Sequence, residues 1–125
     1  MKFSLEENKH DDENNVEWVS WYKDLKEEGD SFEITVSKVN FKEEPKPVFY
    51  LIDEEGGIGT SVFCVNHEDS KFESTPHGIR FVNALGRKYG LIGDLDVEEV
   101  LEPINDSGAT VKVEKTAKGI LWTIL

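Results

Sequence analysis

The chain has 125 residues and a mass of 14.2 kDa, which is enough for one domain with a buried core and too little for two. Charged residues make up 32% and hydrophobic residues 38%, and no apolar run approaches the ~18 residues that a membrane-spanning helix needs. The formal charge of −12 counts against nucleic acid as a partner, because that binding depends on Lys and Arg side chains that neutralise phosphates.

The basic residues are nevertheless bunched. Residues 77–92 contain Arg80, Arg87 and Lys88 without an acid, and residues 107–125 contain three lysines against Glu114 alone. Cys64 has no second cysteine with which to form an intramolecular disulfide, and no apolar signal-peptide core follows Met1. These features predict a cytoplasmic protein.

The N-terminal part divides into two segments. Residues 1–15 are rich in Asp, Glu, Asn and Lys, which predicts a flexible acidic tail. Residues 16–29 are expected to form a helix that packs on the domain behind it, because their large apolar side chains recur at spacings of three and four. These side chains are Trp18, Trp21, Tyr22 and Leu25.

Three strands are predicted next. In residues 31–42 the apolar side chains alternate up to Val36 and then shift by one position to Val39, which is the pattern of a strand with a β-bulge. Residues 48–52 and 59–65 are apolar strands, and the glycines of the intervening turn favour a hairpin.

The second half is expected to contain two helices and two strands. Thr75-Pro76 is typical of a helix start, and Gly90 of a helix end. A shorter helix is expected from Asp96 to Pro103, followed by strands over 109–115 and 120–125. The order β-β-β-α-α-β-β predicts that residues 30–125 form a mainly β domain with helices, a five-stranded barrel of the oligonucleotide/oligosaccharide-binding (OB) type.

In an OB barrel, oligonucleotides bind to the face of the second and third strands and to the loops between strands one and two and between strands four and five. A site for single strands combines basic side chains with aromatic rings on which bases stack. The candidates for such a site are Lys38, Lys42, Lys46, Tyr50, Phe63, Lys112, Lys115, Lys118 and Trp122. The competing interpretation puts the aromatic rings in the barrel interior and the lysines on an ordinary solvated surface. Glu43 and Glu44 weaken the case for a basic binding site in the loop between strands one and two.

No catalytic constellation is found. The run from Gly56 to Gly59 lies between two strands and lacks the Gly-Lys-Ser/Thr of a phosphate-binding loop, so it is interpreted as a turn. The three histidines show no metal-ligand spacing, and Cys64 in an apolar strand is interpreted as a small buried hydrophobe. We therefore expect no enzymatic activity, no metal and no cofactor.

Short glycine-centred signatures carry a resemblance to a known family. The stretch from Glu27 to Val36, the hairpin at Glu55-Gly56-Gly57, the helix with Asn83-Ala84-Leu85-Gly86 and the closing Lys118-Gly119 resemble phage-encoded single-stranded DNA-binding proteins of OB fold. The resemblance covers roughly residues 27–125. It implies a protein of the host cytoplasm that coats single-stranded DNA without sequence preference, acts with replication or recombination proteins and self-associates as a homodimer. The acidic tail at the N-terminus departs from that family, in which such tails lie at the other end.

Two functions are therefore expected. The first is sequence-independent binding of single-stranded DNA. The alternative is an acidic protein-interaction module, an inhibitor or nucleic-acid mimic, which the charge of −12 and the aromatic residues Trp18, Trp21 and Tyr22 favour.

Overall fold

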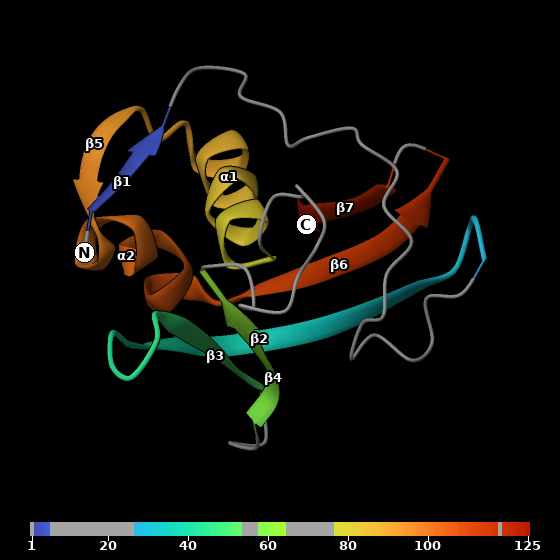
Figure 1. Ribbon diagram of the computed structural model, residues 1–125, viewed down its shortest axis with the longest axis horizontal. Coiled ribbons are helices and arrows are strands. Elements are labelled where there is room, and N and C mark those ends of the chain that lie inside the picture. The colour runs from blue at the N-terminus through green and yellow to red at the C-terminus, as the bar shows by residue number, and fades with distance from the viewer. Residues whose placement is uncertain (1, 6–26, 54–57, 65–76, 118) are drawn as a thin grey trace.

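The structure, a computed structural model, describes residues 2–5, 27–53, 58–64, 77–117 and 119–125 (Figure 1). These ranges form mainly β-structure with two helices. The elements in chain order are β1 (Lys2–Leu5), β2 (Ser31–Lys42), β3 (Val48–Asp53), β4 (Ile58–Phe63), α1 (His77–Tyr89), β5 (Gly93–Asp96), α2 (Val97–Ser107), β6 (Ala109–Thr116) and β7 (Gly119–Ile124). Over the described ranges, neither helix is long and apolar enough to cross a membrane.

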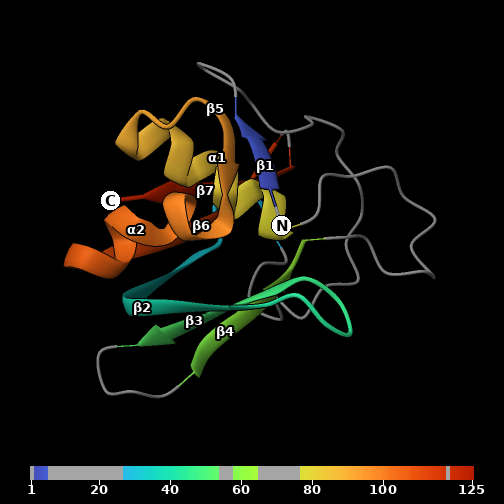
Figure 2. The ribbon, with the colours of Figure 1, turned by 90° about the vertical axis from the view of Figure 1, so that its left-hand side faces the viewer.

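The strands form two antiparallel sheets. The larger sheet has the order β4-β3-β2-β6-β7, and the smaller one pairs β1 with β5. The series β6-β2-β3-β4 is a Greek key, because three strands follow one another and the fourth returns beside the first. Figure 2 shows both helices on one side of β2, β3 and β4. The opposite side of these strands is called the outer face below.

The predicted bulge in the longest strand is confirmed. β2 pairs with β6 through Ser31–Val36 and with β3 beyond that point, and its register with β3 shifts between Val36 and Lys38. Ser37 occupies the bulge, where its hydroxyl donates to the Asp53 carbonyl at 2.9 Å. Val36 and Val39 are consequently both buried although they are three residues apart. The bulge bends β2, so that one strand pairs with β6 before the bulge and with β3 after it.

Aromatic rings fill the core between the sheet and the helices. Phe49 of β3 lies 5.1 Å from Phe41, 5.5 Å from Phe81 of α1 and 5.8 Å from Phe3 of β1, measured between ring centroids. Phe81 in turn lies 5.9 Å from the ring of Trp122 on β7. Such tilted and edge-on pairs stabilise a core beyond the apolar area that they bury.

The expected closed barrel is wrong for this sheet, because its two end strands, β4 and β7, are not hydrogen-bonded to each other in the described chain. The Leu125 N–H donates to Thr110 of β6, so alternate residues of β7 direct their carbonyls to the other edge. There α1 supplies the donors: Arg80 Nη1 lies 2.8 Å from the Ile120 oxygen, and Arg87 Nη2 lies 3.0 Å from the Trp122 oxygen. Helix α1 thus bonds to carbonyls that a closing strand would need.

Residues 2–5 do not belong to a tail. They form β1, whose partner β5 was not predicted either, and they bury Phe3 and Leu5 in the core. Two apolar residues in a four-residue strand are too short a pattern to distinguish from chance. The proposed helix over 16–29 falls outside the described residues up to 26, and the described part, Glu27 to Gly29, is a turn that leads into β2.

Helix α2 continues beyond Pro103, where the sequence predicted its end, and runs to Ser107. Gly108 then ends it with φ of 69°. A Cβ atom on Gly108 would lie 2.9 Å from the Val36 carbonyl oxygen, so both the backbone angle and the space require glycine. This close approach places the last turn of α2 against the bulge of β2.

Beyond the pairing of β2 with β6, one side chain of α2 makes hydrogen bonds to the backbone groups at the edge of β2. The Asn105 carboxamide accepts a hydrogen bond from the Val39 N–H at 2.7 Å and donates to the Val39 carbonyl at 3.3 Å. It thereby replaces the neighbouring strand that β2 lacks at this position.

Replacing Asn105 with Ala is therefore expected to lower the free energy of unfolding by about 1–3 kcal/mol, because the Val39 N–H and carbonyl lose their partner. Urea denaturation measures the change. The matched control is Asp106→Ala, one residue along the same exposed turn of α2, which should stay within about 0.5 kcal/mol of the parent. Equal losses in the two variants would contradict the role assigned to Asn105.

Candidate nucleic-acid interface

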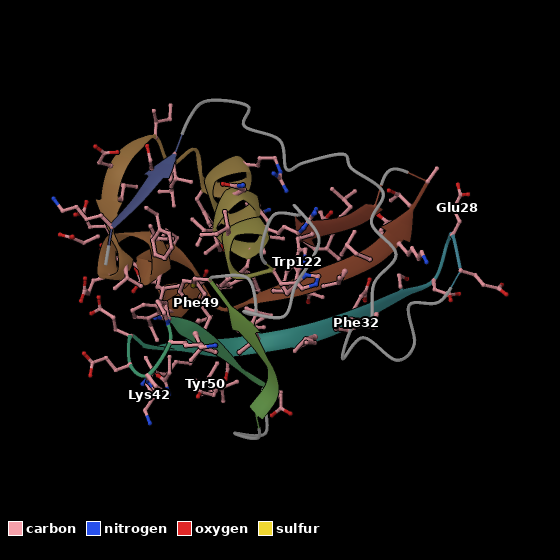
Figure 3. All side chains as sticks on the ribbon, in the orientation of Figure 1. Glu28, Phe32, Lys42, Phe49, Tyr50 and Trp122 are labelled. Atoms are coloured by element: carbon pink, nitrogen blue, oxygen red, sulfur yellow. The ribbon has the colours of Figure 1, made fainter. Side chains whose placement is uncertain are left out.

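Strand alternation places one group of candidate residues together on the outer face of β2 and β3. Lys38 and Lys42 are exposed, and Tyr50 on β3 is half-buried. Figure 3 shows Lys42 and Tyr50 on the side of the sheet away from Phe49 and the helices. The outer face is available for contact at Lys38 and Lys42, which are exposed, and the two described helices lie on the inner side.

The register sets the geometry of this group. Tyr50 is directly opposite Asn40, while Lys38 is opposite Ile52 and Lys42 is opposite Val48. The two lysines are therefore the diagonal neighbours of Tyr50, at about 7–8 Å in an antiparallel pair. One aromatic ring thus has a carboxamide across from it and an ammonium group on either side. We call Lys38, Asn40, Lys42 and Tyr50 the Tyr50 cluster.

The lysines of β6 do not join this cluster. Lys112 and Lys115 are half-buried, and Lys112 is opposite Glu33 of β2. Glu33 precedes Lys38 by five residues, which corresponds to about 16 Å along the strand. Two separate basic regions result, and the second one has a carboxylate beside its lysine.

Trp122 was wrongly predicted to offer a ring for stacking. Its side chain is 0% exposed, and its Nε1 donates to His77 Nδ1 at 3.2 Å. The sequence left its orientation ambiguous because the neighbouring outward positions are also apolar: Leu121 and Leu125 are 40% and 54% exposed. Trp122 is a core residue that anchors β7 to α1.

Three candidates remain apart from the cluster. Lys46 is half-buried in the connection between β2 and β3, which also exposes Glu43 and Glu44. The Phe63 side chain and all of Lys118 lie outside the described residues, although the backbone of Phe63 pairs with Val48 at the end of β4. These positions therefore add nothing to the geometry of the Tyr50 cluster.

His77, which accepts the hydrogen bond from Trp122, is a buried residue that the sequence did not single out. His77 is buried, and burial together with the positive charge of Arg80 lowers its pKa from 6.5 to about 3. The ring is therefore neutral at pH 7. Since its Nδ1 accepts the Trp122 hydrogen bond, the proton of the neutral ring is on Nε2.

Cys64 follows β4 and is buried, as the sequence predicted. Burial raises the pKa of its thiol to about 12, so the thiol stays protonated at neutral pH and is a poor nucleophile. Within the described ranges, no group of three or more His, Cys, Asp or Glu side chains is placed to hold a metal ion.

The residue of the Tyr50 cluster that the sequence analysis missed is Asn40. Strand alternation could have predicted its place in the cluster, because Asn40 lies two residues from both Lys38 and Lys42 on the same side of the predicted strand.

Comparison with protein-family models, with curated proteins and with solved structures gives no match. The Tyr50 cluster is therefore interpreted from its own geometry and chemistry.

Proposed function

We propose that this chain binds single-stranded DNA without sequence preference across the outer face of β2 and β3. The observation that carries the proposal is the Tyr50 cluster: a partly exposed ring between two exposed lysines on a sheet face. Proteins that bind single strands combine such rings, on which bases stack, with cations that follow the phosphates.

The topology supports the same function. In the larger sheet, β2, β3 and β4 precede the segment that contains both helices, and β6 and β7 follow it. This is the order of the OB type, in which the face of the second and third strands contacts the ligand. Tyr50 is on the second strand of that series, β3. We propose on this basis an OB-type fold, opened between β4 and β7. A role in phage DNA replication or recombination in the host cytoplasm is proposed from the resemblance of residues 27–125 to phage single-stranded DNA-binding proteins.

The charge next to this site is mixed, because the exposed Glu43 and Glu44 directly follow Lys42. The acids of α2, by contrast, do not oppose the site directly. The exposed acids of α2 are Glu98, Glu99, Glu102 and Asp106. Helix α2 lies on the helix-bearing side of the sheet, away from Tyr50 (Figures 2 and 3). Charges separated by more than the Debye length of about 10 Å at 0.1 M salt are largely screened from each other.

The alternative function, an acidic protein-interaction module, was expected from the charge of −12 and from Trp18, Trp21 and Tyr22, which lie outside the described residues. Among the described residues, the acidic surface of α2 supports it. It requires no contribution from the Tyr50 cluster, so variants of the cluster separate the two functions.

The test is the binding of a dye-labelled dT oligonucleotide, followed by fluorescence anisotropy at about 50 mM salt. A label on the DNA is preferable to intrinsic fluorescence because Trp122, the tryptophan within the described ranges, is buried. Tyr50→Ala is expected to weaken binding about 5- to 150-fold, since one stacked base contributes about 1–3 kcal/mol. Tyr50→Phe retains the ring and should bind nearly as well as the parent.

The lysines are tested by the salt dependence. The double variant Lys38→Gln/Lys42→Gln should reduce the slope of log K against log salt by about 1.4, because each phosphate contact with a single strand contributes about 0.7. Lys88→Gln, an exposed position on α1, is the matched control and should leave the slope nearly unchanged. Absence of binding by the parent chain at micromolar concentration and low salt would refute the proposed function.

A further inference from the structure

Asn40 is an exposed residue at the centre of the Tyr50 cluster whose carboxamide is available for a hydrogen bond to a ligand. It is directly opposite Tyr50, and its side chain makes no hydrogen bond to another residue of the described ranges. Asn105, by contrast, has its carboxamide committed to the backbone of β2. Asn40 is therefore placed to bond to whatever lies on the ring of Tyr50.

The chemistry of a carboxamide suits one feature that all bases share. Asn has both an acceptor oxygen and donor N–H groups. The Watson–Crick edge of every base carries an adjacent donor and acceptor: N6–H and N1 in adenine, N4–H and N3 in cytosine, N1–H and O6 in guanine, N3–H and O4 in thymine. One carboxamide can match each of these pairs. In a duplex the same edge is occupied by the complementary base, whereas in a single strand it is available to side chains.

Opposite residues of an antiparallel pair have Cβ atoms about 4.5–5.5 Å apart. A base that stacks on the ring of Tyr50 would therefore have an edge within reach of the Asn40 carboxamide. The flanking lysines, Lys38 and Lys42, would hold the phosphates on either side of that base. The face of the base, the edge of the base and the flanking phosphates thus each meet a matching side chain in the cluster.

We propose that Asn40 bonds to the Watson–Crick edge of the base stacked on Tyr50, and that this contact selects unpaired bases of any sequence over duplex. This inference rests on the proposed function. It assigns the selectivity for single strands to a hydrogen bond to the base, in addition to stacking.

The test compares an oligonucleotide of thymidine with one of N3-methylthymidine. The methyl group replaces the N3–H donor and leaves the phosphates and the ring faces in place. The parent chain is expected to bind the thymidine strand about three- to tenfold more tightly than the methylated strand, which is the range for one neutral hydrogen bond. Asn40→Ala should bind both strands alike, with the weaker affinity.

Thr35→Ala is the matched control, because Thr35 is exposed on β2 and lies outside the Tyr50 cluster. It should retain the parent preference for thymidine. Equal binding of both strands by the parent chain, or a preference that persists in Asn40→Ala, would overturn the role of Asn40 and leave the proposed function standing. Failure of the parent to bind either strand would instead refute the proposed function itself. Unchanged thermal unfolding of Asn40→Ala verifies that the variant is folded.

Discussion

Replacing Phe3 with Ala is expected to lower the free energy of unfolding by about 3–5 kcal/mol, although it is the third residue of the chain. Its side chain is 5% exposed, and its ring lies 5.8 Å from that of Phe49 at the centre of the core. The strand that carries it, β1, also contacts both helices. Loss of the ring leaves a cavity among β3, α1 and α2 that these elements cannot fill without moving.

Urea denaturation of the parent and the variant measures this loss. Ser4→Ala is the matched control because Ser4 is the next residue of β1 and is exposed. It should change the free energy of unfolding by no more than about 0.5 kcal/mol. A Phe3→Ala variant as stable as Ser4→Ala would show that β1 does not belong to the core.

Acidification is the second perturbation with a large expected effect. The pKa of His77 is about 3 in the folded chain and 6.5 as its ordinary value, so the unfolded chain binds the proton more readily between these limits. The contribution of neutral His77 to stability is complete above pH 6.5 and is lost as the pH falls through this window. The loss is about 1.4 kcal/mol for each pH unit well inside the window.

The physical cause is the position of the ring. A charged His77 would be buried beside Arg80, and its protonated Nδ1 could no longer accept the hydrogen bond from Trp122. Free energies of unfolding, measured in urea at several pH values between 7 and 4, should decline with the expected slope.

His77→Asn isolates this contribution. The Asn side chain keeps an acceptor for Trp122 and does not titrate, so this variant should lose about 1.4 kcal/mol less per pH unit than the parent. Parallel pH profiles for the two proteins would contradict the assignment of the acid sensitivity to His77.

Local signals in the sequence predicted the larger sheet well. The shift of the apolar pattern after Val36 placed the bulge, because only one side of β2 faces the core and the side-chain period of a strand is two. The two hairpins, β3 with β4 and β6 with β7, follow directly from apolar runs separated by turn residues.

The sequence could not predict which side chains form hydrogen bonds with the backbone groups at the edges of the sheet. Arg80 and Arg87 bond to carbonyls of β7 that are 40 and 35 residues away along the chain, and Asn105 bonds to Val39 across 66 residues. An Arg on a helix is ordinarily a solvated residue, so the burial of Arg80 depends on a tertiary contact that no local pattern encodes. Arg80 and Arg87 occupy the edge of β7 at which a closing strand would pair.

The candidate site was predicted in part. Lys38, Lys42 and Tyr50 come together because strand alternation and hairpin register fix their positions, both of which are local properties. Lys115 was assigned to the same site from its place at the loop between strands four and five of a closed barrel, and Lys112 from its place on strand four. They lie elsewhere because the open sheet extends along β2 and separates Lys112 from Lys38.

The most direct test of the binding surface is a map of backbone amide chemical-shift changes during titration of the ¹⁵N-labelled chain with a dT oligonucleotide. The largest changes should fall on Lys38, Asn40, Lys42 and Tyr50 and on their neighbours in β2 and β3, with small changes on α2. Changes concentrated on the acidic surface of α2 or on β6 and β7, or no changes at all at saturating DNA, would contradict the proposal that this sheet face binds single strands.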